Sequence, residues 1–131
     1  MIIEFAIPGR PQHQVRHRDR GQGGKYDPCR GAKRQFALLA RRWAPPVPLA
    51  GPLQVDLEFY FARPKSHYRT GRYAGQLKPG APVWHTSKPD EDNLRKFVLD
   101  ALAGLFWADD ARVCDGRTQK RYDERPRTVV R

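Results

Sequence analysis

Hydrophobic and polar residues alternate through residues 52–61, and this period of two predicts a strand with one buried face. The residues expected to face inward are Leu53, Val55, Leu57, Phe59 and Phe61. A short apolar stretch at residues 2–7 predicts a first strand, and residues 111–122 and 127–131 predict two more, separated by Arg125-Pro126. The chain is therefore expected to form a small mixed sheet of about four or five strands.

Two segments show the spacing of three and four residues that is typical of an amphipathic helix. The first is residues 32–43, where Lys33 flanks an apolar stripe made of Phe36, Leu39, Ala40 and Trp43. The second begins near Asp90 and is suited to end at Gly104 as a C-cap. Its apolar stripe consists of Leu94, Phe97, Val98, Ala101, Leu102 and Leu105. Each stripe is wide enough to pack one side of its helix against a sheet.

Two long basic loops separate these elements, at residues 10–31 and 63–88. The first contains several glycines and no hydrophobic periodicity, so it is expected to be mobile or to become ordered only on a partner. The second is long enough to be functional rather than a simple connection. The 131 residues are therefore predicted to form one domain, residues 1–131, of the α/β (α+β) class, with two main helices on the sheet.

The sequence lacks the features of membrane and secreted proteins. No apolar run approaches the roughly 20 residues that span a bilayer, and the N-terminus does not resemble a signal peptide. Two cysteines, Cys29 and Cys114, cannot form a disulfide framework, so a cytoplasmic location is expected. Cys114 lies in a predicted strand and is expected to be a small buried hydrophobic residue.

Charge is distributed unevenly along the chain. The net charge is +11, and residues 62–88 contain six basic groups and no acid. Basic segments of this kind favour binding to a polyanion, because Lys and Arg displace counterions from phosphates. Six of the fourteen acidic residues, however, lie between residues 89 and 110. This acidic segment would repel a phosphate backbone unless a cation lies between them.

The acidic segment contains the best candidates for chemistry. Asp90 and Asp92 open the second predicted helix, Asn93 and Lys96 lie on its polar face, and Asp109-Asp110 follows its end. Mg²⁺ is usually held by one or two carboxylates together with phosphate oxygens and water. Such an ion promotes phosphodiester hydrolysis, and a nearby lysine would offset charge in the transition state.

The two acidic groups are separated by the predicted helix, whose length of about 15 residues corresponds to roughly 20 Å. They meet only if the chain after Gly104 doubles back along the helix, or if a dimer partner supplies one of them. A purely structural interpretation also stands, because acids in the first turn of a helix are favoured and Asp90 suits an N-cap.

The motifs in this region resemble those of the RusA-type Holliday junction resolvases, including phage-type members. The matching residues are Lys88-Pro89-Asp90-Glu91-Asp92-Asn93-Leu94-Arg95-Lys96, Asp100-Ala101-Leu102 and Trp107-Ala108-Asp109-Asp110. Residues 63–68 and His85-Thr86 resemble the loop before this motif in phage-type members, while Tyr26-Asp27-Pro28 and residues 126–129 fit more loosely. The resemblance is strong for residues 63–115 and weak for residues 9–43.

The resemblance implies a homodimeric endonuclease that binds four-way DNA junctions and cuts two strands with Mg²⁺ or Mn²⁺, without an organic cofactor. It implies that Asp90, Asp92 and Asp110 bind the metal and that Lys96 is the essential basic residue. Asp109 and Asn93 are then expected to contact the metal-binding side chains without binding the metal themselves.

The basic loops supply the candidate DNA contacts. These are Arg16, Arg18, Arg20 and Lys25 in the first loop, and Lys65, Arg69, Arg72 and Lys88 in the second. His67, Tyr68 and Tyr73 are interleaved with Lys65, Arg69 and Arg72, and they could stack on unpaired bases near a junction centre or simply pack locally. Phe106 and Trp107 are expected in the core or in a dimer contact. His13, His17 and Cys29 suggest zinc only weakly, because no full set of four ligands accompanies them.

These observations together predict a metal-dependent, structure-selective endodeoxyribonuclease that resolves Holliday junctions in DNA recombination and repair. Two alternatives stay open. The chain could be a non-catalytic basic protein that binds nucleic acid, or a related nuclease that acts on flaps or other branched substrates.

Overall fold

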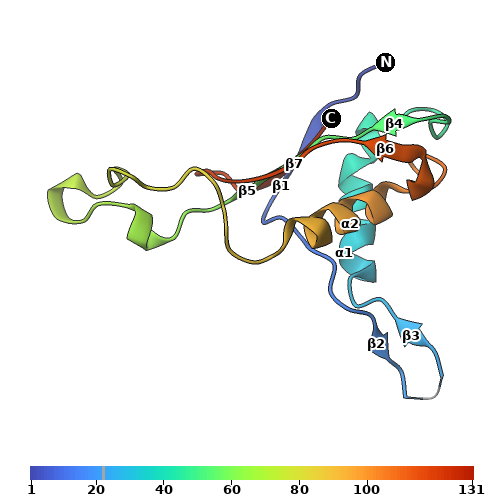
Figure 1. Ribbon diagram of the computed structural model, residues 1–131, viewed down its shortest axis with the longest axis horizontal. Helices are drawn as coiled ribbons and strands as arrows, with labels where there is room; N and C mark the ends of the chain where they lie inside the picture. Colours follow the sequence, from blue (N-terminus) through green and yellow to red (C-terminus); the bar gives the residue numbers. More distant parts are fainter. Residues whose placement is uncertain (22) are drawn as a thin grey trace.

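A four-stranded mixed sheet and two helices form the centre of the computed structural model, which describes residues 1–21 and 23–131 (Figure 1). The strands of the sheet are β1 (Phe5–Pro8), β8 (Arg127–Val130), β5 (Leu57–Phe61) and β7 (Thr118–Tyr122), in that order across the sheet. β5 runs parallel to β7 and antiparallel to β8, which in turn is antiparallel to β1. The predicted α+β class and mixed sheet are confirmed.

The helices are α1 (Arg30–Ala40) and α2 (Glu91–Leu102), which pack against each other and against the sheet. Buried side chains from α2 and β5 form the centre of the core, as the hydrophobic pattern predicts. The side chains with almost no exposed area are Leu57, Phe59, Leu94, Phe97, Val98 and Leu102. Phe106 and Trp107, directly after α2, are also buried and belong to the same cluster.

Shorter elements complete the fold. Two small two-stranded sheets pair β2 (Arg18–Asp19) with β3 (Lys25–Tyr26), and β4 (Leu53–Gln54) with β6 (Val113–Asp115). Single 3₁₀ turns are η1 (Arg41–Trp43), η2 (Lys65–His67), η3 (Gly71–Tyr73) and η4 (Asp110–Arg112). Within the described residues, no helix combines the length and the apolar character that crossing a membrane requires.

Two predicted strands are each divided. The expected strand 52–61 is β4 followed by β5, because β4 leaves the main sheet to pair with β6. The expected strand 111–122 is η4, β6 and β7, with the break at Gly116. Gly116 has φ +146°, and a Cβ atom there would lie 1.8 Å from the carbonyl oxygen of Val55. The close approach of these two backbones redirects the chain from one sheet into the other.

The expectation that residues 10–31 lack order without a partner is wrong. Gln14 and Cys29 are buried, and the backbone amide of Gln14 donates to the carbonyl of Asn93 on α2 at 2.9 Å. β2 and β3 form an antiparallel pair inside this segment. The segment is anchored because its polar groups bond to α2, which no hydrophobic periodicity reveals.

Three individual burial predictions are also wrong. Lys33 is buried although it flanks the predicted stripe of α1, whereas Leu39, within that stripe, is 44% exposed. Cys114 lies in β6 as expected for a strand, but its side chain is exposed. β6 belongs to a two-stranded sheet at the side of the core, so its alternate residues face solvent rather than a second layer.

Candidate active site

The first turn of α2 presents uncommitted carboxylates to solvent. Asp90 occupies the N-cap position, yet its side chain makes no capping hydrogen bond within the described structure. Asp92 accepts one from the backbone amide of Asn93 at 2.9 Å. Both side chains are exposed, as is that of Glu91 between them. The alternative in which Asp90 serves only to cap the helix is therefore weakened, because its carboxylate oxygens do not perform that role.

The position of this turn is fixed by the residues around it. Leu94, just inside the helix, has no exposed area, and the carbonyl of Asn93 accepts the amide of Gln14. Before the helix, the carbonyl of Ser87 accepts a hydrogen bond from Lys120 Nζ at 2.6 Å. The carboxylates thus stand on a rigid element supported from both sides, which is the arrangement that a precise binding site requires.

Lys96 lies four residues after Asp92 in α2, and its side chain is exposed. Side chains four residues apart share one face of a helix, so Lys96 and Asp92 are neighbours on the surface. Asn93 is half-buried, and its backbone, rather than its side chain, has a defined structural contact. The predicted polar face of the helix start is therefore present.

Asp110 lies beyond the other end of α2. Its Oδ1 accepts a hydrogen bond from the buried indole Nε1 of Trp107 at 3.1 Å, while the aspartate itself is exposed. Asp109 caps the 3₁₀ turn η4, because its Oδ1 accepts the amide of Ala111 at 2.8 Å. The Asp110 carboxylate thus faces outward beside Trp107, and the Asp109 carboxylate stabilises the turn η4.

The two acidic groups do not meet within one chain. α2 has 12 residues and hence a length of about 18 Å, with Asp90 at its start and Asp110 past its end. β6 and β7, which return along the domain, follow Asp110 in the chain (Figure 1). Among residues 1–21 and 23–131, no three His, Cys, Asp or Glu side chains lie close enough to share a metal ion.

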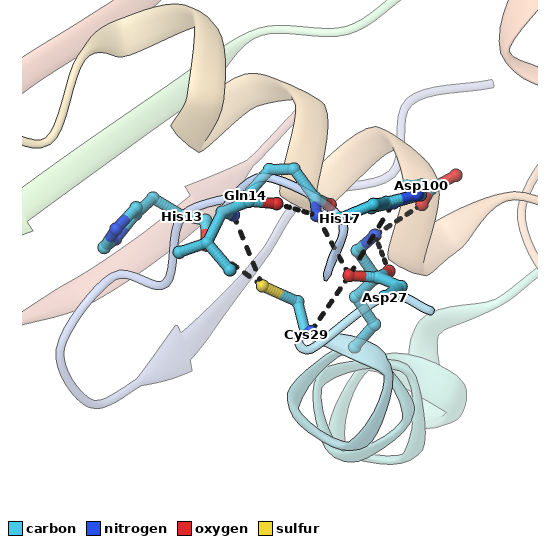
Figure 2. Close-up of polar contacts among 8 residues, drawn as sticks. His13, Gln14, His17, Asp27, Cys29 and Asp100 are labelled. Carbon is cyan, nitrogen blue, oxygen red and sulfur yellow. Dashed lines mark hydrogen bonds and ion pairs between the residues drawn. The ribbon is translucent and has the colours of Figure 1, made fainter. Parts of the chain in front are cut away.

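A partly buried ion-pair network links the segment before α1 to both helices, and the sequence interpretation missed it. Lys33 Nζ on α1 contacts Asp27 Oδ2 at 2.5 Å and Asp100 Oδ2 on α2 at 2.6 Å (Figure 2). Asp27 Oδ1 also accepts from the side chain of Gln14 and the amide of Cys29. The sequence did single out both acids, in Tyr26-Asp27-Pro28 and Asp100-Ala101-Leu102, but it did not indicate that they share Lys33 as a partner.

The network shifts the pKa values of its members in opposite directions. Burial alone would raise the pKa of Asp27, but hydrogen bonds from Lys33, Gln14 and Cys29 hold it well below its ordinary value of 3.8. Burial alone would lower the pKa of Lys33, but Asp100 and Asp27 raise it above its ordinary value of 10.5. Both charges therefore stabilise the folded state at neutral pH.

We expect Lys33→Met to lower the free energy of unfolding by about 2 kcal/mol at pH 7, because two carboxylates lose their shared cation. The deficit should shrink below about pH 4, where Asp27 in the unfolded chain is protonated, and above about pH 10.5, where Lys33 in the unfolded chain is neutral. Urea denaturation across pH measures both. Arg34→Met, at an exposed neighbour on α1, is the control, and an equal loss in the two variants would contradict the prediction.

The residues that weakly suggested zinc have other contacts. Cys29 Sγ lies 3.5 Å from both the amide of Val15 and the carbonyl of His13. The side chain of His17 points toward Asp27, with Nε2 at 3.9 Å from Oδ1 (Figure 2). Cys29 therefore fastens the segment before β2 to the start of α1.

The predicted DNA-contact residues lie on two projections of the domain. Arg16, Arg18, Arg20 and Lys25 are exposed on or beside the β2–β3 hairpin. Lys65, Arg69 and Arg72 are exposed on the segment between β5 and α2, and Lys88 is exposed two residues before Asp90. In the view of Figure 1, the start of α2 lies between the two projections.

The domain is strongly basic, and exposed carboxylates stand at the start of α2. The chain belongs to the Endodeoxyribonuclease RusA family, which matches residues 8–131. It is also 35% identical over 133 residues to "Uncharacterized protein YqaN" of Bacillus subtilis (strain 168), an alignment covering 98% of this chain and 93% of that relative. The family resemblance of the motifs is confirmed, and it places the chain among endodeoxyribonucleases of the Holliday junction resolvase type.

Proposed function

We propose that this chain is a divalent-metal-dependent endodeoxyribonuclease that cuts four-way DNA junctions in pairs as a homodimer. The observation that supports this most directly is the set of uncommitted carboxylates at the start of α2, beside Lys96 and between two basic projections. Charge of this sign and placement suits a phosphate backbone, with a cation between the acids and the DNA.

The carboxylates of Asp90 and Asp92 fit a hard divalent cation. They supply exposed oxygen donors from one helical turn, and Mg²⁺ is commonly held by one or two carboxylates, with water and substrate phosphate as its other ligands. When bound, such an ion polarises the phosphoryl group and lowers the pKa of the attacking water. Mn²⁺ accepts the same oxygen ligands, so either ion suits the site.

In this proposal, Asp110 acts in the site of the partner subunit. Metal–oxygen distances of 2.0–2.6 Å are far shorter than the helix that separates Asp110 from Asp90 in one chain. A two-fold axis can bring the start of one α2 to the outward-facing Asp110 of the second copy. A four-way junction is itself two-fold symmetric, so a symmetric dimer presents two sites for paired cuts.

Lys96 and the remaining charged residues then have distinct roles. The ammonium group of Lys96 stabilises the negative charge that develops on the phosphoryl oxygens. Asp109 holds the turn that presents Asp110. Arg16, Arg18, Arg20 and Lys25 on the hairpin, and Lys65, Arg69, Arg72 and Lys88 before α2, bind the phosphates of the junction arms.

Cleavage of defined substrates tests the function. Labelled four-way junction, flap and linear duplex are incubated with the protein and either Mg²⁺, Mn²⁺ or EDTA, and the cuts are mapped. We expect paired, symmetric cuts in the junction that require the metal. Salt-sensitive binding without any cleavage would instead support a non-catalytic binding protein, and preferential cutting of the flap would support a nuclease for other branched DNA.

A mixture of two inactive variants tests whether sites are shared between subunits. Asp90→Asn and Asp110→Asn homodimers should each be inactive, whereas subunit exchange yields heterodimers with one intact site. We therefore expect nicking of one strand to reappear on mixing, measured on a junction labelled on all four strands. If each site lay within one chain, both sites of every heterodimer would stay defective and no nicking would return.

A further inference from the structure

Residues 63–85 form an ordered projection, here called the basic arm, that extends away from the sheet (Figure 1). Its outer part is a tight hairpin: Tyr68 pairs with Leu77, and the amide of Arg69 donates to the carbonyl of Gln76 at 2.8 Å. The amide of Lys78 donates to the carbonyl of His67 at 2.9 Å. The arm therefore presents its tip in a defined conformation.

The base of the arm is fixed to β7. The amide of Tyr122 donates to the carbonyl of Val83 at 2.9 Å, and the amide of His85 donates to the carbonyl of Lys120 at 3.0 Å. The ring of His85 stacks on Phe61 at 4.0 Å between centroids. An isolated antiparallel bridge between Trp84 and Arg121 thus joins the returning side of the arm to the β7 edge of the sheet, and His85 lies five residues before Asp90.

Aromatic and apolar side chains on the arm are exposed instead of packed. Tyr73 at the tip is 41% exposed, and Trp84 at the base is 51% exposed. Leu77 and Val83 are similarly open to solvent. Tyr73 and Trp84 keep a large fraction of their side chains exposed, whereas His67 and Tyr68 are half-buried and His67 packs edge-on against Tyr122.

Cations lie against these rings, without acidic partners. The Arg69 guanidinium carbon is 3.9 Å from the centroid of Tyr73, with that of Arg72 at 5.3 Å, and the Arg121 guanidinium carbon is 4.7 Å from the centroid of Trp84. Residues 62–88 contain no acid, and in the described part of the chain neither Arg69 nor Arg72 is within ion-pair distance of a carboxylate. Exposed rings flanked by unpaired guanidinium groups are a surface for stacked bases and their phosphates.

We infer that the basic arm is a base-stacking element that recognises unpaired or unstacked bases at a DNA branch point, with Tyr73 as its principal contact. Bases inside a continuous duplex have no free face for the ring, whereas bases at a branch or gap expose one. The arm therefore selects DNA structure rather than sequence. This inference rests on the proposed function, because it assigns the feature by which that site finds branched substrates.

Binding measurements without divalent metal test the arm, because cleavage then does not contribute. Fluorescence anisotropy in EDTA gives the affinity for a four-way junction, a duplex with a gap of three thymidines, and a continuous duplex. We expect Tyr73→Ala to weaken binding to the junction and the gapped duplex by about tenfold, and to change binding to continuous duplex by less than twofold. Tyr73→Phe should retain wild-type affinity for all three, because the ring is kept.

Leu38→Ala provides the matched control, since Leu38 is an exposed apolar residue on α1 outside the arm, and it should change none of the affinities. Equal losses on all three DNAs, or no loss on any, would overturn the inference. Junction cleavage by Tyr73→Ala at saturating protein with Mg²⁺ separates the two proposals. If Tyr73→Ala still cuts the junction and binds the three DNAs with wild-type selectivity, only the base-stacking role of the arm is refuted. If the wild-type protein binds branched DNA selectively but never cuts it, only the proposed nuclease activity is refuted.

Discussion

Asp90→Asn should reduce junction cleavage by a factor on the order of 10³, while junction binding persists or strengthens. The substitution keeps the size of the side chain and its suitability as an N-cap, but it removes the negative charge that would hold a cation. Removing that charge also lessens repulsion of the phosphate backbone. Single-turnover cleavage at saturating protein with Mg²⁺, together with anisotropy in EDTA, measures the two effects separately.

Glu91→Gln is the matched control for this substitution. Glu91 is exposed in the same turn and loses the same charge, yet it is not assigned to the site. Its cleavage rate should stay within a few fold of the wild-type rate. An active Asp90→Asn protein with ordinary metal dependence, or equal losses in both variants, would refute the assignment of Asp90 and reduce the site to a general acidic patch.

Gly116→Ala should be the most destabilising single substitution away from the core, with a loss of at least about 4 kcal/mol in the free energy of unfolding. A Cβ atom would lie 1.8 Å from the carbonyl oxygen and 2.7 Å from the carbonyl carbon of Val55, both rigid backbone atoms. The backbone between β6 and β7 would have to separate from the start of β5. Urea denaturation or a low yield of folded protein reports the effect.

Gly9→Ala separates this collision from the strain of an unusual backbone conformation. Gly9 also has a positive φ, +107°, but a Cβ atom there meets nothing within 4 Å. Its substitution should cost only about 1–2 kcal/mol. If Gly116→Ala were no more destabilising than Gly9→Ala, the close approach to Val55 would not determine the turn between the two sheets.

Helical periodicity predicted α2 and its buried face well, because one continuous apolar stripe specifies both. The same pattern placed Asp90 and Asp92 at the start of the helix and Lys96 one turn further along its polar face. It failed for Lys33, because a lysine is polar by every local measure. Only the docking of α1 on α2, with Asp27 folded back from the preceding segment, supplies the two carboxylates that permit its burial.

The relation between Asp90 and Asp110 illustrates a second limit. Their separation along the chain is compatible with a chain that doubles back and with a partner that supplies one acid. The answer depends on where the chain turns back, and in the structure Asp110 lies in η4, ahead of β6 and β7. Alternation through residues 52–61 likewise identifies the buried face of the strand. It does not reveal that Leu53 and Gln54 pair with β6 in another sheet, because strands of either sheet show the same alternation.

The uncommitted N-cap of α2 also has a thermodynamic consequence. A capping side chain ordinarily stabilises a helix by about 1 kcal/mol, and Asp90 forgoes that contribution while adding to the repulsion among three successive acids. The first turn of α2 is thus less stable than it would be with a capping hydrogen bond from the Asp90 side chain. Any cation that binds the folded form alone recovers the deficit through mass action, so the melting temperature should rise with metal concentration. In the proposed function, Asp90 gives up a stabilising cap in order to hold a cation.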